Sequence, residues 1–396
     1  MRIYLVGGAI RDRLLGRPIK EQDYLVVGAT PEQMLSQGYR QVGKDFPVFL
    51  HPVSGAEYAL ARLERHGSQA ADAGVTLEED LSRRDLTLNA LAEDEQGRLI
   101  DLFGGVRDLE QRWLRHVSPA FAEDPIRVLR VARFMARYGE LGFRVAPETL
   151  DLMGSMVAAG QLDHLVPERV WSETQRALGE TRPSAFLETL RACGALARVF
   201  PEIDRLWGVP QPSNWHPEVD TGAHLLMVVN QARRLSDDPL VVFAALTHDL
   251  GKGNSPPAQW PHHQGHEGRG VVLLDGLCDR LRVPGRFRDL ARQVARYHSL
   301  VHRADQLTPS AARQVLEGVD AFRRPARLEP FLLACEADFR GRLGFAERPY
   351  PQADRFRAWL GAASQIDLTQ VLVPGLAPEA IRDALAAARE RAIQQV

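Results

Sequence analysis

The sequence LVGGAIRD at residues 5–12, followed by EQDYLVVG at residues 21–28, decides the fold class. Each stretch contains a short apolar run that is typical of a β-strand. The first run leads through Gly7 and Gly8 into a segment that predicts a helix. Two glycines let the backbone approach a ligand closely, and a helix start favours bound anions. With the guanidinium of Arg11 nearby, Gly8 and Arg11 outline a triphosphate-binding turn, although a plain strand-to-helix turn would show the same residues.

The second stretch contributes a pair of carboxylates. Positions i and i+2 of a strand point to the same face, so we expect Glu21 and Asp23 to lie side by side. Like charges at that distance repel unless cations neutralise them. A pair of Mg²⁺ ions would bridge them and activate an attacking oxygen. An exposed polar turn is the alternative, but the glycine turn just before the pair makes a catalytic magnesium site the better interpretation.

Residues 1–118 alternate between strand-like and helix-like runs, which predicts a small mixed α/β domain. The predicted strands are 3–6, 23–27, 48–51, 57–62 and 98–101. The predicted helices are 11–15, 31–37 and 86–91. From residue 119 onward we expect no strands, and apolar spacing predicts helices at 126–138, 147–159, 167–178 and 184–199.

The chain therefore reads as an α+β protein with an all-helical remainder. We expect a head (1–118), a helical neck (119–210), a second helical unit (211–344) and C-terminal helices (345–396). The proline-rich stretch 207–217 reads as a linker.

The composition excludes some classes of protein but does not identify the function. The 396 residues carry 49 basic and 51 acidic side chains, so any nucleic-acid surface depends on local charge segregation. No apolar run approaches the ~18 residues of a membrane span. The three cysteines, Cys193, Cys278 and Cys335, have no disulfide or zinc spacing, which favours a reduced, cytoplasmic setting.

Two arginine-rich motifs follow the acidic pair. Residues 83–90 read RRDLTLNA, in which Asp85 precedes the predicted helix 86–91 and could cap it. Residues 123–134 read EDPIRVLRVARF. Asp124, Arg127, Arg130 and Arg133 recur there at three-residue steps, and a solvated arginine face is the simple interpretation.

As an ordered set, these motifs resemble those of the bacterial CCA-adding enzymes, the class II tRNA nucleotidyltransferases of the polymerase-β-like superfamily. The set also includes DLFGG at 101–105 and PERVW at 167–171. The resemblance implies addition of C, C and A to tRNA 3′ ends from CTP and ATP, without a template and with release of pyrophosphate. It assigns Gly8, Arg11 and Arg84 to the triphosphate or ribose, Asp124 and Arg127 to the base, and Arg130 and Arg133 to the rest of the nucleotide pocket.

Elementary chemistry agrees with the assignment of Asp124 and Arg127 to the base. Cytosine and adenine present an amine beside a ring-nitrogen acceptor, which matches a carboxylate beside a guanidinium. Guanine and uracil present the reverse polarity and would leave buried charged groups mispaired.

Two departures from the family pattern matter. Glu21 stands where the family usually has Asp, and its longer arm shifts the oxygens around Mg²⁺, which is strict about geometry. The stretch 66–76 also looks shorter than the flexible loop that the family associates with the switch from CTP to ATP.

The second half contains HDLGK at residues 248–252, with further histidines on either side. Imidazole and carboxylate together suit divalent transition metals. The order resembles the HD superfamily of metal-dependent phosphohydrolases, with Ni²⁺ or Mn²⁺ as candidate ions and 2′,3′-cyclic phosphates or related monoesters as substrates. The residues implied are His224, His248, Asp249, His266, His298 and Asp338. His262 and His263 compete with His266 for its place.

Several alternatives remain open. The chain could be a poly(A) polymerase, a CC-only adding enzyme, an HD phosphohydrolase with an impaired head, or a non-catalytic tRNA-binding protein. We expect tRNA, CTP and ATP as partners, no membrane, and a monomer or homodimer.

Overall fold

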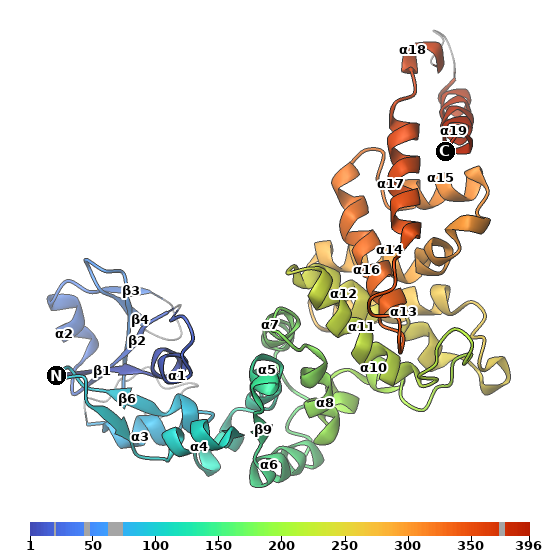
Figure 1. Cartoon of the computed structure of the whole chain (residues 1–396). Helices are drawn as coiled ribbons and strands as arrows, with labels where there is room; N and C mark the ends of the chain where they lie inside the picture. Colours follow the sequence, from blue (N-terminus) through green and yellow to red (C-terminus); the bar gives the residue numbers. More distant parts are fainter. Residues whose placement is uncertain (20, 43–47, 62–73, 372–376) are drawn as a thin grey trace. The chain divides into compact units, whose positions relative to one another are not determined.

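The computed structural model describes residues 1–19, 21–42, 48–61, 74–371 and 377–396. The chain forms two compact units, residues 1–162 and 163–396, and each is considered by itself (Figure 1).

Unit 1 is built around a seven-stranded mixed sheet with the order β3-β4-β5-β2-β1-β6-β7. The central strand β2 pairs parallel with β5 and antiparallel with β1. The strand bounds are β1 Arg2–Val6, β2 Asp23–Val27, β3 Arg40–Val42, β4 Val48–Leu50, β5 Glu57–Leu60, β6 Leu91–Glu93 and β7 Leu99–Asp101.

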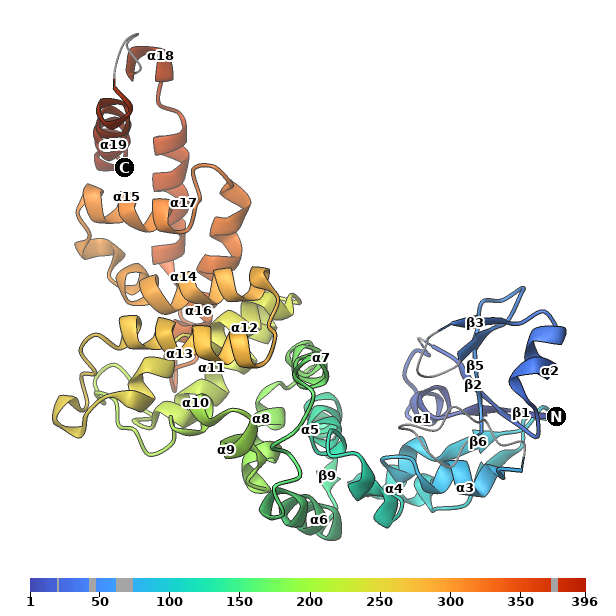
Figure 2. The ribbon, with the colours of Figure 1, turned by 180° about the vertical axis from the view of Figure 1, so that it is seen from behind.

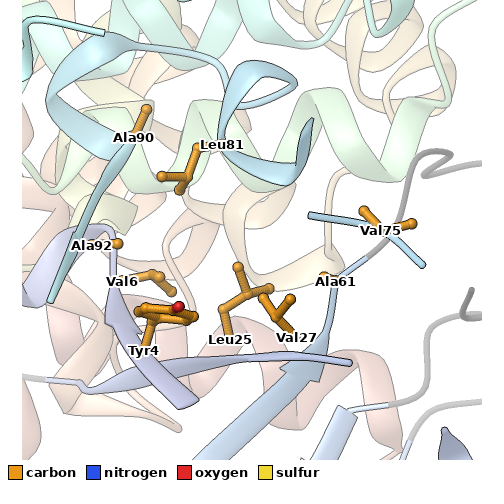
Figure 3. Close-up of a cluster of buried hydrophobic side chains, with 9 residues drawn as sticks. All are labelled: Tyr4, Val6, Leu25, Val27, Ala61, Val75, Leu81, Ala90 and Ala92. Carbon is orange, nitrogen blue, oxygen red and sulfur yellow. The ribbon is translucent and has the colours of Figure 1, made fainter. Parts of the chain in front are cut away.

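Apolar side chains cover both faces of the sheet because β1 and β2 alternate their side chains. On one face Leu25 and Val27 pack with Leu81 of helix α3 (Leu77–Ser82), as Figure 3 shows. On the other face Val26 packs with Met34 of helix α2 (Pro31–Ser36). Asp23 has the parity of Leu25, so its side chain shares the face of the first cluster.

The head agrees with the expected mixed α/β domain, but one helix prediction was wrong. Residues 86–91 form only a 3₁₀ turn, η1 (Thr87–Asn89), and then enter strand β6. Asp85 does not cap that turn, because its carboxylate binds Arg130 and Asn89 instead. Strand β6 pairs with β1 and β7, so long-range pairing overrides the local helical pattern. Strands β3 and β6 and helices α3 and α4 (Gly105–Gln111) were not predicted.

The helical part of unit 1 contains α5 (Arg127–Tyr138) and α6 (Pro147–Ala158), close to the predicted ranges. The expectation of no strands after residue 119 was wrong, because β9 (Arg144–Val145) pairs with β8 (Trp113–Leu114). This two-residue ladder is too short to leave a period-two pattern in the sequence.

Every described element of unit 2 is helical (Figure 2). Its main helices are α7 Pro167–Leu178, α8 Ser184–Ala192, α9 Ala195–Val199, α11 Thr221–Leu235, α12 Pro239–Thr247, α13 His266–Arg280, α14 Gly285–His302, α15 Pro309–Gly318, α16 Leu328–Arg340, α17 Pro351–Ser364 and α19 Pro378–Gln394; two four-residue helices, α10 Pro201–Asp204 and α18 Leu368–Val371, complete the set. The predicted helix 184–199 is broken at Gly194, whose φ of 79° fits glycine best. Among the described helices of the chain, none is long and apolar enough to span a membrane.

The proline-rich stretch 207–217 is not a free linker, which corrects the sequence prediction. Gln211 and His216 are buried, and Gln211 accepts a hydrogen bond from Lys252 at 2.6 Å. We call residues 210–220 the strap, because Pro210 also forms a bridge to Asp220. The prolines correctly indicated a turn-rich segment, but the polar contacts that hold this segment in place cannot be predicted from composition.

Candidate functional sites

The glycine turn holds two guanidinium groups close to the backbone. Gly7 has a φ of 73°, and a Cβ there would lie 3.1 Å from an Arg84 Nη atom. A Cβ on Gly8 would lie 3.3 Å from Arg11 Nη2. The first residue of helix α1 (Gly8–Leu14) is Gly8, so free backbone N–H groups face the same place. The structure thus brings together Gly8, Arg11 and Arg84, which the family resemblance assigned to the triphosphate or ribose.

A hydrogen-bond network fixes these arginines. Arg11 donates to Asn89 Oδ1 at 2.5 Å, and Asn89 in turn donates to Asp85 Oδ1 at 2.9 Å. Arg84 donates to the Asn89 carbonyl at 3.2 Å and pairs with Asp80. The motif at 83–90 is therefore the support that orients both guanidinium groups.

The acidic pair lies at the start of β2 in an open pocket of about 580 Å³. Strand β2 begins at Asp23, so Glu21 precedes the strand rather than sharing its face as expected, yet both residues line the pocket. Partial desolvation by the surrounding protein and the charge of Glu21 raise the pKa of Asp23, while Arg84 opposes this shift. The two carboxylates are thus close enough to repel each other.

A third carboxylate joins them. The parallel register places Glu57 of β5 directly opposite Asp23, and Glu57 lines the same pocket. Because facing residues of paired strands point the same way, three carboxylates gather at one end of the sheet. Three oxygen donors in an open, hydrated pocket fit Mg²⁺, which binds carboxylates together with water and substrate phosphates.

The arginines of α5 are held by several partners. Arg130 pairs with the buried Asp85 at 2.8 Å. Arg127 is 3% exposed and donates to the carbonyls of Ala120 and Arg83. Arg133 lies over the Phe134 ring at 4.5 Å, and Arg11 lies 5.3 Å from the same ring.

Asp124 is half-buried at the end of the 3₁₀ helix η2 (Pro119–Glu123), next to the start of α5. Asp12 accepts hydrogen bonds from Tyr138 and Arg137 and so ties α1 to α5. Helix α5 therefore lies beside the glycine turn. The shortened-loop prediction concerns 66–76, of which 66–73 lie outside the described residues.

The second constellation is a buried histidine and aspartate cluster in unit 2. Helices α11, α14 and α16 supply His224, His298 and Asp338, while His248 and Asp249 follow α12 and His266 begins α13. All six side chains predicted from the sequence are buried. Asp249 Oδ1 lies 3.3 Å from His266 Nε2 and 3.5 Å from His298 Nε2. Of the competing histidines, His262 is exposed, and His263 contacts the strap rather than the cluster, because its Nε2–H donates to the Pro210 carbonyl at 2.8 Å.

The hydrogen bonds of the imidazoles set their tautomers. The Nδ1 atoms of His248, His266 and His298 each face a backbone carbonyl, at 2.7, 3.1 and 2.9 Å. A proton on Nδ1 leaves a lone pair on Nε2, which is the form that ligates metals. The buried atoms His248 Nε2, His266 Nε2 and Asp249 Oδ1 have no hydrogen-bond partner, and Asp249, His266 and His298 form one group with the spacing of metal ligands. The donor set fits a divalent transition metal.

The charges of the buried carboxylates also support a metal site. Lys252 Nζ lies 2.6 Å from Asp249 Oδ2. Two buried carboxylates need cations nearby, because an uncompensated buried charge is strongly destabilising.

Gly251 allows the cluster to close. A Cβ at this position would lie 1.9 Å from the His266 carbonyl oxygen, so only glycine lets α13 pack against the HDLGK turn. This close approach brings His266 to Asp249.

Three neighbouring residues were missed in the sequence. His302 Nε2 lies 2.5 Å from Asp338 Oδ2, and Glu218 Oε1 lies 3.0 Å from His216 Nδ1 and 2.9 Å from His224 Nδ1. The spacing of His298 and His302, one helical turn apart, was a usable signal. The other two lie in the strap: His216 falls within the stretch 207–217 that was interpreted as a linker, and Glu218 directly follows that stretch.

Comparison with known families gives three matches along the chain. A model described as "Poly A polymerase head domain" matches residues 3–115, and one described as "Probable RNA and SrmB- binding site of polymerase A" matches residues 142–206. A model described as "HD domain" matches residues 221–329.

Whole-chain similarities extend this result. The chain is 60% identical over 403 residues to the "Multifunctional CCA protein" of Thioalkalivibrio sulfidiphilus, covering 100% of this chain and 98% of the relative. It is also 60% identical over 402 residues to the protein of that description from Nitrosococcus oceani, with the same coverage. Among solved structures, the Bacillus stearothermophilus CCA-adding enzyme in complex with CTP matches with a TM-score of 0.67 and 24% identity, over 99% of this chain and 89% of that one. At this identity the structural match shows a shared fold.

Proposed function

The chain belongs to the multifunctional CCA proteins, and from this premise we propose that it adds C, C and A to the 3′ end of tRNA from CTP and ATP, without a template and with release of pyrophosphate. The observation that carries the proposal is the convergence of an anion-binding turn and three carboxylates within unit 1. A triphosphate and its metals need both kinds of group.

Glu21 and Asp23 are the proposed catalytic residues and magnesium ligands, with Glu57 beside them. Bound Mg²⁺ lowers the cost of charge on the attacking 3′-oxygen and on the leaving pyrophosphate. Gly8, Arg11 and Arg84 hold the triphosphate or ribose. Because the network through Asn89 fixes the guanidinium groups in advance, little reorganisation is needed when the nucleotide binds.

Asp124 and Arg127 are the proposed base-reading pair. Arg127 uses two of its N–H groups on backbone carbonyls, and a guanidinium has five, so donors remain for a ring nitrogen. The hydrogen bonds to these two carbonyls fix the orientation of the Arg127 guanidinium group. Arg130 and Arg133 complete the pocket on the same helix.

The decisive experiment is end addition to tRNA that lacks CCA, with CTP alone, ATP alone and both together. We expect two C residues with CTP alone and full CCA with both nucleotides. Growth of an A-only tail would identify a poly(A) polymerase, and a stop after CC would identify a CC-adding enzyme.

Asp23→Ala should abolish addition, with a loss of about a thousandfold, because metal-ion catalysis contributes several kcal/mol of charge stabilisation. Glu95→Ala, an exposed carboxylate in unit 1, is the matched control. Full addition by Asp23→Ala would refute the metal assignment.

A second activity is supported by the buried cluster of unit 2. We propose that His224, His248, Asp249, His266, His298 and Asp338 hold a transition metal such as Ni²⁺ or Mn²⁺ and hydrolyse 2′,3′-cyclic phosphates or related monoesters. The unpartnered Nε2 and Oδ1 atoms support this assignment. A bound metal would lower the pKa of a water molecule and polarise a phosphate oxygen.

The remaining sequence predictions extend the proposal. We propose a head at 1–118, a neck at 119–210, a hydrolase domain at 211–344 and C-terminal helices at 345–396, in a cytoplasmic monomer or homodimer. Size-exclusion chromatography with light scattering would determine the oligomeric state.

A further inference from the structure

The two oxygens of Asp338 face different groups. Oδ1 lies 2.9 Å from His224 Nε2 and 3.5 Å from His248 Nε2, inside the histidine cluster. Oδ2 lies 2.5 Å from His302 Nε2 on the outer side. Oδ1 thus faces the histidines of the proposed metal site, and Oδ2 is held by His302.

Both ring nitrogens of His302 are engaged. Nδ1 lies 2.8 Å from the Tyr350 hydroxyl and Nε2 lies 2.5 Å from Asp338. A carboxylate can only accept a hydrogen bond, so Nε2 carries the proton and donates. Nδ1 then has a lone pair, and the Tyr350 hydroxyl donates to it. This assignment leaves His302 no free lone pair for a metal, despite its position one helical turn after His298.

Tyr350 comes from a part of the chain that follows the matched HD domain. It directly precedes α17 (Pro351–Ser364), is 5% exposed, and packs against Phe339 with ring centroids 5.1 Å apart. Phe339 is the residue after Asp338, so the aromatic contact and the hydrogen-bond chain hold the same turn of α16.

We propose that Tyr350 and His302 are positioning residues for the hydrolase site, acting through the chain Tyr350 O–H to His302 Nδ1 and His302 Nε2–H to Asp338 Oδ2. The chain fixes the rotation of the Asp338 carboxylate, so that Oδ1 faces the histidine cluster. This inference rests on the proposed phosphohydrolase function and deepens it. It also makes the segment after residue 344 part of the site.

The test uses Tyr350→Phe in the full-length protein, because this change removes one hydroxyl and keeps the ring packing. The measurement is Mn²⁺ binding to metal-stripped protein by calorimetry. We expect about tenfold weaker binding, the lower end of the effect of removing a partner of a metal ligand. Tyr297→Phe, on α14 of the same unit, is the matched control and should bind as wild type does.

His302 provides a rescue test. His302→Ala removes both links and should weaken Mn²⁺ binding further, whereas His302→Gln keeps a donor for Asp338 and should recover part of the loss. CTP addition to tRNA by each variant reports whether the chain is folded. A merely structural role would lower the melting temperature equally in both His302 variants without restoring metal binding in the glutamine variant.

The outcomes separate the two proposals. Wild-type protein is compared with Asp249→Ala, which removes a proposed ligand. If the two bind Mn²⁺ equally, or if neither binds it, the metal assignment itself fails. If wild type binds Mn²⁺ and Tyr350→Phe binds it equally well, the metal assignment stands and the positioning chain is overturned.

Discussion

The carboxylates of the head and those of unit 2 differ in almost every physical respect. Glu21 and Asp23 lie exposed in an open pocket with oxygen neighbours. Asp249 and Asp338 are buried among imidazoles, and Nε2 of His266 and Nε2 of His298 lie 3.3 and 3.5 Å from Asp249 Oδ1. An open oxygen site suits a hard, hydrated ion that arrives with a phosphate substrate, whereas a buried nitrogen-rich site suits a resident transition metal. Under the proposed assignments, burial and ligand type keep two metal chemistries apart within one chain.

Buried carboxylates also differ between the two units. Asp85 of unit 1 receives hydrogen bonds from Leu86, Asn89 and Arg130, so its oxygens are saturated. Asp249 keeps Oδ1 without a hydrogen-bond partner. Saturation fits a structural role for Asp85, and the unpartnered Oδ1 fits the proposed ligand role of Asp249, because buried polar atoms are rarely left unpaired without a reason.

The largest expected effect separates the two sites. The double substitution His248→Ala with Asp249→Ala should reduce hydrolysis of a 2′,3′-cyclic nucleotide by about a thousandfold, since Lewis-acid stabilisation worth several kcal/mol is lost. CTP addition to tRNA should stay within about twofold of wild type. If hydrolysis persists, the phosphohydrolase site lies elsewhere in the chain, and the comparison between the two metal sites fails.

Asp85→Ala tests the structural carboxylate. We expect a loss of about 1–3 kcal/mol in the unfolding free energy, because the buried donors of Asn89 and Leu86 lose their acceptor and the partly exposed Arg130 loses its ion partner. The measurement is urea denaturation, with Asp151→Ala on the surface of α6 as the control. A loss no larger than the control's would show that the network does not support unit 1.

The contribution of Asp85 to stability depends on pH with a defined sign. Burial raises the pKa of Asp85, but Arg130, Asn89 and the Leu86 N–H together hold it well below its ordinary value. The stabilisation is therefore present at neutral pH and is lost as the pH falls below about 4, the unfolded value. Wild type and Asp85→Asn should converge in urea midpoint toward acid pH, and curves that stay parallel would contradict the ion pair.

The smallest effect concerns Glu21. Glu21→Asp restores the shorter arm typical of the family, and we expect a rise in CTP addition of up to about tenfold, because Mg²⁺ favours near-ideal geometry. Glu21→Gln removes the charge and should lower the rate. A lower rate in Glu21→Asp would show that this pocket is fitted to the longer side chain.

Sequence reasoning predicted most of the fold but less of the supporting structure. Strand β2 and helix α7 were predicted with the bounds the structure shows, because local patterns determine them. Strand β6 was missed because only pairing with β1 and β7 stabilises it as a strand. The groups that bring site residues together, such as Asn89 and the strap, act over long sequence separations that no spacing rule reveals.

Site residues follow the same division. The side chains that carry reactive chemistry stand in short motifs and could be selected from the sequence. Several partners of those side chains were not identified, since His302 joins Asp338 through helix packing and Glu218 joins His224 through the fold of the strap.

The strap has a practical consequence for anyone dissecting the molecule. Its prolines invite a cut between residues 207 and 217, yet an excised fragment starting after that point would lack Gln211 and His216 and would leave Lys252 without its amide acceptor. A workable fragment boundary lies near residue 163, where the second compact unit begins, because Trp171 of α7 packs against Phe243 of α12 and Phe287 of α14.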